Sequence, residues 1–149
     1  MNVWRDGHQD DALLEDQTVA GVWGVIPAER FASIRAALNE QNEQPWGVRE
    51  TFPYYPDTIG YMGGDYHNGA VWPWLNFADA IARCRYGFCD DGLRILREVG
   101  QWDLEQNGDY LPHENLHGEN GAGTNHYIQG WDANYLAAVM WGLNGEWPR

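Results

Sequence analysis

The hydrophobic residues of this chain recur at helical spacing in five separate segments. Within each segment apolar side chains repeat every three or four positions, which places them along one stripe of an α-helix. The pattern predicts helices over five ranges: Asp11 to Gly24, Pro27 to Gln41, Trp72 to Tyr86, Asp90 to Glu105, and Trp131 to Leu143. The last of these is apolar on most sides, so we expect it to be buried on more than one face. The tryptophans Trp23, Trp102 and Trp141 fall on apolar helix faces and are predicted to be core residues.

Two intervening segments, residues 42–70 and 106–130, have no such period. Both are rich in glycine, and the first also carries three prolines among several aromatic residues. We predict long loops there, with at most short β-ladders, because loops of this length inside a compact domain are uncommon unless they have a function. The first ten residues are polar and acidic and are predicted to fray. The expected fold is therefore mainly α, with helical hairpins and their long loops gathered at one end.

The first irregular segment leads into ten residues, Asp65 to Trp74, in which four rings lie beside an amide, a glycine and a proline. Gly69 permits a turn or a close backbone approach, and Pro73 suits the first turn of a helix. A sugar ring has an apolar face and a rim of hydroxyls, so flat rings beside amide and carboxylate groups are typical of a sugar-binding cleft. Large aromatic residues also dominate protein cores. From the motif alone, a binding cleft and a tryptophan-rich core corner both stay open.

Length and composition restrict the possible functions. The 149 residues predict a single domain over 1–149, and a hydrophobic fraction of 44% is sufficient for a core. A formal net charge of −13 argues against nucleic acid and anionic membrane surfaces as partners. All nine basic residues are arginine, which removes lysine-dependent chemistry. No apolar run has the length of a membrane span and the first residues lack a signal-peptide core, so we expect a cytoplasmic protein.

Cysteine and histidine positions give no metal or cofactor site. Cys84 and Cys89 are five residues apart, which is not a zinc spacing, and we predict buried free thiols. His113 and His117 are four apart, but without a helical context or a third ligand they do not predict a metal. We expect no cofactor.

Several motifs resemble those of a known family. Tyr66-His-Asn-Gly-Ala-Val-Trp-Pro73 is similar to the "YHNG-x-VWP" signature of six-hairpin (α/α) toroid glycosidases, which include the glucosidase part of glycogen-debranching enzymes, alkaline invertases and mannosylglycerate hydrolase-like enzymes. The flanking motifs agree in order: Val22-Trp-Gly-Val-Ile-Pro27, Trp46-Gly-Val-Arg49, Pro112-His-Glu-Asn115 and Gln129-Gly-Trp131. The resemblance covers roughly residues 13–145 and implies the C-terminal portion of such an enzyme, an incomplete (α/α) toroid.

The resemblance also implies residue roles. These enzymes invert the anomeric centre with an acid and a base on opposite sides of the bond. Glu114 lies where the family places the base, although the spacing also admits Glu119. The substrate-binding residues implied or predicted beside them are Tyr66, His67, Asn68, Trp72, Trp74, Gln129 and Trp131.

One departure from the family leaves the function open. The general acid of these enzymes lies upstream of the region covered, so it is either missing or replaced by a local group such as Asp65 or Glu50. Half of an acid–base pair does not give half of the catalysis. The favoured hypothesis is therefore a glycosidase-like protein that retains a carbohydrate-facing cleft. The alternatives are an active inverting glycosidase acting on an α-glucoside with Glu114 as base, and a structural remnant without sugar binding.

A chain with about five helices of such a ring leaves two flanks open. The first and last predicted helices carry apolar side chains on those flanks, and soluble monomers rarely expose large apolar patches. We therefore expect a homo-oligomer, most simply a two-fold dimer.

Overall fold

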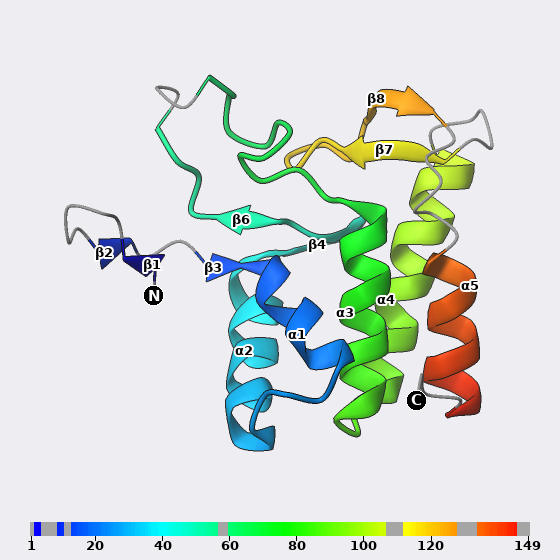
Figure 1. Ribbon diagram of the computed structural model, residues 1–149. Helices are drawn as coiled ribbons and strands as arrows, with labels where there is room; N and C mark the ends of the chain where they lie inside the picture. Colours follow the sequence, from blue (N-terminus) through cyan, green and yellow to red (C-terminus); the bar gives the residue numbers. More distant parts are fainter. Residues whose placement is uncertain are drawn as a thin grey trace.

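The computed structural model describes residues 2–3, 9–10, 13–56, 60–106, 112–127 and 134–145. These residues form a mainly helical body with loops and short strands gathered at one end (Figure 1). The helices are α1 (Val19–Val22), α2 (Ala28–Gln41), α3 (Pro73–Arg85), α4 (Cys89–Gln101) and α5 (Asn134–Ala138). A 3-10 helix, Glu15–Thr18, precedes α1, and π-helical turns follow α4 at Trp102–Gln106 and α5 at Val139–Leu143.

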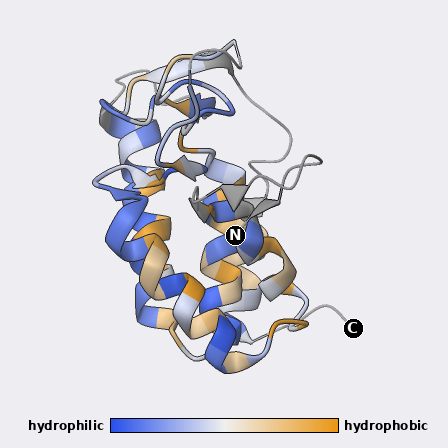
Figure 2. Ribbon diagram, turned by 90° about the vertical axis from the view of Figure 1, so that its left-hand side faces the viewer, coloured by the Kyte–Doolittle hydropathy of each residue, from blue (hydrophilic) through white to orange (hydrophobic). Residues whose placement is uncertain are grey.

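Helix α3 lies at the centre of the body. It begins at Pro73, as predicted. Proline suits this position because the backbone N–H that it lacks would have no hydrogen-bond partner in the first turn of a helix. Residues 75–83 are all buried, and the helix packs against α1, α4 and α5. In Figure 2 hydrophobic and hydrophilic residues alternate along the helices, as expected of amphipathic segments. The main core consists of side chains from α2, α3 and α4, among them Phe31, Leu38, Phe77, Ile81, Ile95 and Val99.

Four antiparallel pairs of short strands complete the described chain. They are β1 (Asn2–Val3) with β2 (Gln9–Asp10), β3 (Leu13–Leu14) with β6 (Thr51–Phe52), β4 (Glu43–Gln44) with β5 (Gly47–Val48), and β7 (His113–Leu116) with β8 (Gly123–Tyr127). The short ladders expected within residues 42–70 and 106–130 are thus present. The β1–β2 pair falls in the segment predicted to fray, and that expectation stays a prediction.

The first predicted helix is wrong over its N-terminal half. Leu13 and Leu14 are in β3, where their backbones pair with Phe52 and Thr51, and Glu15 N–H continues the pairing by donating to Glu50 O at 2.8 Å. Apolar residues at helical spacing do not form a helix when a neighbouring backbone offers them a strand partner. Trp23, predicted to be in the core, is 61% exposed because the chain turns outward after α1 at Gly24, whose φ is 69°.

The last predicted helix is present over its described residues, but it is not buried on more than one face. Tyr135 and Met140 are 44% and 40% exposed, whereas Ala138 is buried against the core. The helix buried on nearly all sides is α3, because α1, α4 and α5 pack around it. None of the helices among the described residues is both long enough and apolar enough to cross a membrane.

The prediction of free thiols is also wrong. Cys84, at the end of α3, forms a disulfide with Cys89, at the start of α4. The turn between these helices contains Gly87 at φ 87°, and it brings the two Cα atoms to 3.8 Å. Both cysteines are half-buried rather than enclosed in the core.

Candidate functional site

Backbone hydrogen bonds bring the two long loops together at the end of the molecule opposite the helix hairpin turns (Figure 1). Val71 and Leu116 exchange both N–H···O bonds at 2.8 Å, and Gly118 N–H donates to Gly64 O at 2.7 Å. Strand β7, which carries Glu114, therefore lies against the loop that carries Tyr66 and leads into α3. Residues separated by more than forty positions in the chain become neighbours in this way.

The motif loop gathers a cluster of rings. The His67 ring stacks on Trp72 with centroids 5.1 Å apart and an interplanar angle of 17°, and Tyr66 meets Trp72 edge-on at 4.9 Å. Tyr61 lies 5.1 Å from Tyr66. Trp72 is 3% exposed, whereas the His67 side chain is 57% exposed. The cluster is thus buried at Trp72 and open to solvent at His67.

The backbone of this loop is unusual at two positions. Tyr66 has φ 40°, a conformation that non-glycine residues seldom adopt and that tends to occur at functional sites. Gly69 has φ 100°, and a Cβ there would collide with the Tyr54 ring and come within 2.8 Å of Thr51 O. The close approach predicted for Gly69 is confirmed.

Glu50 belongs to this cluster although the sequence marked it only as a possible replacement for the missing acid. Trp72 Nε1–H donates to Glu50 Oε2 at 2.8 Å, and His67 Nδ1 lies 3.4 Å from both carboxylate oxygens. The Glu50 backbone is fixed as well, because its N–H donates to Ala70 O at 2.9 Å. Glu50 directly follows Arg49 in the loop before β6. Apart from its charge, nothing in the sequence indicated that it would lie in this cluster.

Glu114 is the second carboxylate beside the rings. It is 8% exposed, and within the described part of the chain no hydrogen bond or ion pair reaches its carboxylate. Burial raises the pKa of Tyr66, and the negative charge of Glu114 raises it further, with smaller contributions from Tyr61 and Glu50. The charges of Glu50 and Glu114 both contribute to raising the pKa of Tyr66. We therefore refer to one group of residues as the ring–carboxylate site: Glu50, Tyr66, His67, Trp72 and Glu114.

Glu119, the alternative candidate for the base, has partners of its own. Arg49 Nη1 lies 3.2 Å from Glu119 Oε1, and the Tyr54 hydroxyl donates a hydrogen bond to the same oxygen. Arg49 also donates to Gln41 O at 2.7 Å and to Asn42 O at 3.3 Å. This arrangement assigns Glu119 to a loop-bracing ion pair.

Asn68, in the motif loop, and Trp74, in the first turn of α3, both make contacts within the protein. The Asn68 amide is fully buried; its oxygen accepts from Tyr55 N–H at 2.7 Å, and its nitrogen donates to Tyr55 O and Tyr61 O at 3.0 Å. A direct contact between this amide and a sugar would require the loop to open. Trp74 is half-buried and packs on the small cluster formed by Ala70, Trp72 and Leu75. Of the other candidates, Gln129 and Trp131 lie outside the described residues.

His113 is held within the protein rather than presented to a metal. Its Nδ1 lies 2.7 Å from Asp103 Oδ1, its N–H donates to the same carboxylate at 3.2 Å, and its residue is 3% exposed. Within the described residues, no three His, Cys, Asp or Glu side chains gather in a way that could hold a metal ion.

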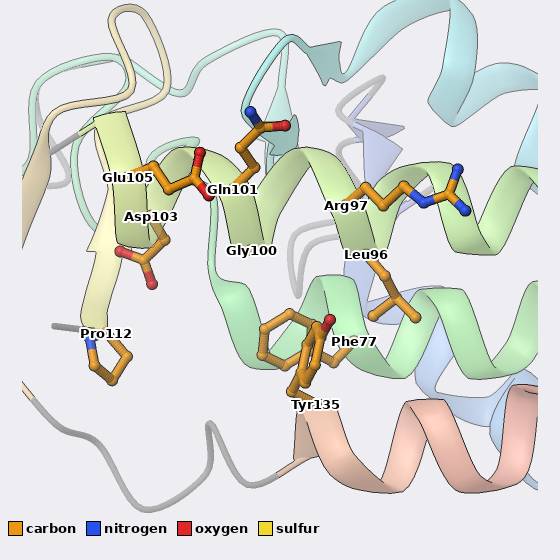
Figure 3. A pocket seen from close by; sticks show the side chains of 9 residues that line it. All are labelled: Phe77, Leu96, Arg97, Gly100, Gln101, Asp103, Glu105, Pro112 and Tyr135. Carbon is orange, nitrogen blue, oxygen red and sulfur yellow. The ribbon is translucent and has the colours of Figure 1, made fainter. Parts of the chain in front are cut away.

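An open cavity of about 640 Å3 lies away from the ring–carboxylate site, between α3, α4 and α5 (Figure 3). The rings of Phe77 and Tyr135 meet edge-on there, 5.3 Å apart, beside Leu96. None of the candidate site residues lines this cavity. Its wall is mainly apolar, and its polar lining residues are Arg97, Gln101, Asp103 and Glu105, of which Asp103 is paired with His113.

The fold resembles that of known proteins, although the sequence does not match them closely. No protein-family model and no curated protein matches the chain. A solved structure of GH63 mannosylglycerate hydrolase from Thermus thermophilus in complex with glucose aligns with a TM-score of 0.65 at 20% identity, over 91% of this chain and 32% of that one. An uncharacterized conserved protein from the same organism aligns with a TM-score of 0.64 at 20% identity, over 88% of this chain and 30% of that one. The chain thus spans about a third of the length of these proteins and shares the fold of that part.

Proposed function

We propose that the protein is glycosidase-like and binds a carbohydrate at the ring–carboxylate site. The observation that carries the proposal is Glu114, a carboxylate that is 8% exposed and has no described hydrogen-bond or ion-pair partner. A carboxylate beside the rings that has no described partner inside the protein is able to accept hydrogen bonds from a ligand. The hydroxyls of a sugar are hydrogen-bond donors suited to that role.

The neighbouring groups fit the same ligand. The exposed His67 ring, which stacks on the buried Trp72 ring, offers a flat surface for the C–H face of a pyranose, while Glu50 and Glu114 supply acceptors at its edge. The similarity in fold to a GH63 hydrolase whose structure contains glucose supports this choice of ligand class.

Hydrolysis is the second candidate, and the presence of two carboxylates near Tyr66 favours it. An inverting glycosidase needs one carboxylate as base and the other as acid. Glu114 suits the base. Glu50, however, already accepts the Trp72 N–H at 2.8 Å and is therefore engaged within the protein. Binding is therefore the better supported function, and hydrolysis with Glu114 as base is the alternative.

Calorimetric titration with α-linked gluco- and manno-disaccharides, with free monosaccharide measured in the same samples, tests both candidates. We expect millimolar or tighter binding without release of monosaccharide, which corresponds to about −4 kcal/mol or more. Glu114→Gln should weaken the binding by about tenfold, because the amide cannot accept from two hydroxyls as a carboxylate does.

The matched control is Glu105→Gln, which makes the same change on an exposed residue that lines the separate cavity. Its affinity should equal that of the wild type. Absence of binding to every sugar tested would overturn the proposal. Release of monosaccharide that is lost in Glu114→Gln and kept in Glu105→Gln would establish hydrolysis in place of binding alone.

A further inference from the structure

We infer that Asp103 is a positioning residue of the ring–carboxylate site and that it acts on Glu114 through His113. The inference rests on the proposed function and deepens it, because it says how the acceptor Glu114 is held for a ligand. Asp103 lies in the π-helical turn that follows α4, and His113 directly precedes Glu114 in β7. The pair therefore joins the helical body to the strand that carries Glu114.

Asp103 holds both the ring and the backbone of His113. His113 Nδ1 lies 2.7 Å from Asp103 Oδ1, and the His113 backbone N–H donates to the two carboxylate oxygens at 3.2 and 3.3 Å. Each residue is 3% exposed, so water competes little for these contacts. In Figure 3 the Asp103 side chain lies beside Pro112, the residue before β7. A residue whose ring and backbone are bonded to the same carboxylate has little freedom to turn.

Glu114 lies between two fixed points of β7. Before it, His113 is bonded to Asp103, and after it, Leu116 and Val71 exchange both N–H···O bonds at 2.8 Å. Successive side chains of a strand point to opposite faces, so His113 and Glu114 project in opposite directions. The contact that fixes His113 therefore also fixes the direction in which the Glu114 side chain leaves the backbone.

The ladder between β7 and β8 is irregular at Glu114. His113 pairs with Tyr127 and Asn115 pairs with Thr124, so β8 has one residue more than β7 over this interval. An extra residue of this kind disrupts the ladder locally, and such bulges are common beside functional sites. The contact with the helical body thus holds β7 at the place where its own strand pairing is disrupted.

Removal of the acceptor tests the inference. We expect Asp103→Ala to bind the disaccharide that the wild type binds best about tenfold more weakly, measured by titration followed by NMR chemical shifts. In a protein that already carries Glu114→Ala, the same change should alter the affinity by less than about threefold. A residue that acts through Glu114 has no further effect once that carboxylate is removed, whereas an independent structural residue gives additive losses.

Two further variants separate positioning from stability. Ile95→Ala removes a fully buried side chain from the main core on α4, so it should destabilise the protein in urea denaturation and leave the affinity within about threefold of the wild type. Asp103→Asn keeps an acceptor oxygen for His113 and should restore the affinity to within about threefold of the wild type.

Amide hydrogen exchange follows the contact itself without a ligand. The His113 amide should exchange at least about tenfold faster in Asp103→Ala than in the wild type, relative to the Leu116 amide, which keeps Val71 O as its acceptor. An unchanged ratio would show that Asp103 does not hold β7 and would overturn the inference.

The outcomes separate the inference from the proposed function. Wild-type affinity in Asp103→Ala, or an equal loss with and without the Glu114 carboxylate, overturns the inference and leaves sugar binding intact. A tenfold loss in Ile95→Ala, or binding by Asp103→Asn as weak as that by Asp103→Ala, overturns it as well. Binding of no sugar by the wild type overturns the proposed function and the inference with it. If Asp103→Ala does not fold, His113→Phe takes its place in the titrations, because it removes the ring donor and keeps the ring shape and the backbone N–H.

Discussion

The carboxylates of the helical body and of the loop end differ in the partners that they meet. In the body, Asp79 is fully buried and meets the fully buried Arg83, whose Nε donates to it at 2.8 Å. Arg83 also donates to Asp91 and to Asn39 at 2.7 Å each. At the loop end, the Glu114 residue is 8% exposed, and its carboxylate has no described hydrogen bond or ion pair.

The difference separates structural charges from candidate functional ones. A buried ion pair is destabilising when one member is removed, because the other is left as an uncompensated charge. Replacing Glu114 breaks no described hydrogen bond or ion pair, so it leaves no partner uncompensated. Stability measurements on the two regions should therefore give opposite results, and the following predictions test this contrast in order of decreasing effect.

Replacement of Arg83, the buried arginine of the helical body, should cause the largest change in the free energy of unfolding. Arg83→Met leaves Asp79 buried without its partner and deprives Asp91 of one, so we expect a loss of about 3–5 kcal/mol in the free energy of unfolding. Urea denaturation measures it. Arg30→Met, an exposed change on α2, should stay within about 0.5 kcal/mol. Equal effects of the two variants would show that the buried network does not stabilise the body.

Loss of Arg49 should give a smaller effect at the loop end. Arg49→Met leaves Gln41 O without its side-chain donor and breaks the ion pair with Glu119, whereas Asn42 O keeps the bond from the backbone N–H of residue 49; we expect a cost of about 2 kcal/mol. Glu119→Gln should cost less than about 1 kcal/mol, because the Glu119 side chain is 55% exposed. The same denaturation experiment compares the two. A larger cost for Glu119→Gln than for Arg49→Met would contradict the interpretation that Arg49 holds these loop segments together.

The pH dependence of stability should follow Asp91. Burial acts to raise the pKa of Asp91, but hydrogen bonds from Arg94 and Arg35 and the charge of Arg83 outweigh it and hold the pKa well below its ordinary value of 3.8. Asp91 therefore contributes stability that is present above pH 3.8 and is lost as the pH falls below it. Asp79, whose pKa is raised by its burial, opposes this trend. Denaturation curves recorded down to about pH 3 should lose less stability in Asp91→Asn than in the wild type. An equal or steeper acid loss in that variant would refute this role.

Replacement of the unpartnered carboxylate should have almost no effect on folding. Glu114→Gln should change the free energy of unfolding by less than about 0.5 kcal/mol, or increase it, because no described contact is broken. Thermal and urea denaturation without ligand check this. A loss of about 2 kcal/mol would show that Glu114 holds the fold and would remove the contrast between the two regions.

The smallest expected change in stability concerns the exposed flanks. Trp23 is 61% exposed at the end of α1, and Met140 is 40% exposed beyond α5, which fits the proposal that the chain self-associates. Light scattering at micromolar concentration should give a mass above 17.0 kDa for the wild type and a lower mass for Trp23→Ser, with stability changed by less than about 0.5 kcal/mol. A wild-type mass of 17.0 kDa would exclude the homo-oligomer.

The sequence by itself determined the helical architecture and the place of the important loop. The apolar stripes of α2, α3 and α4 depend on residues three and four positions apart, so a local pattern was sufficient to predict them. The roles of Pro73 at the start of α3 and of Gly69 at a close backbone approach were also predicted from the sequence. Each depends on the conformational preference of a single residue type.

Only the tertiary structure decided which groups meet. Leu13 and Leu14 formed a strand because β6 lies beside them, and Cys84 and Cys89 formed a disulfide because a turn brought two helix ends together. A hydrogen bond joins Glu50 to Trp72, 22 positions along the chain. Another joins Glu119 to Arg49, 70 positions away, and this partner distinguishes Glu119 from Glu114. Such contacts depend on how loops pack in three dimensions, and no periodicity along the sequence records them.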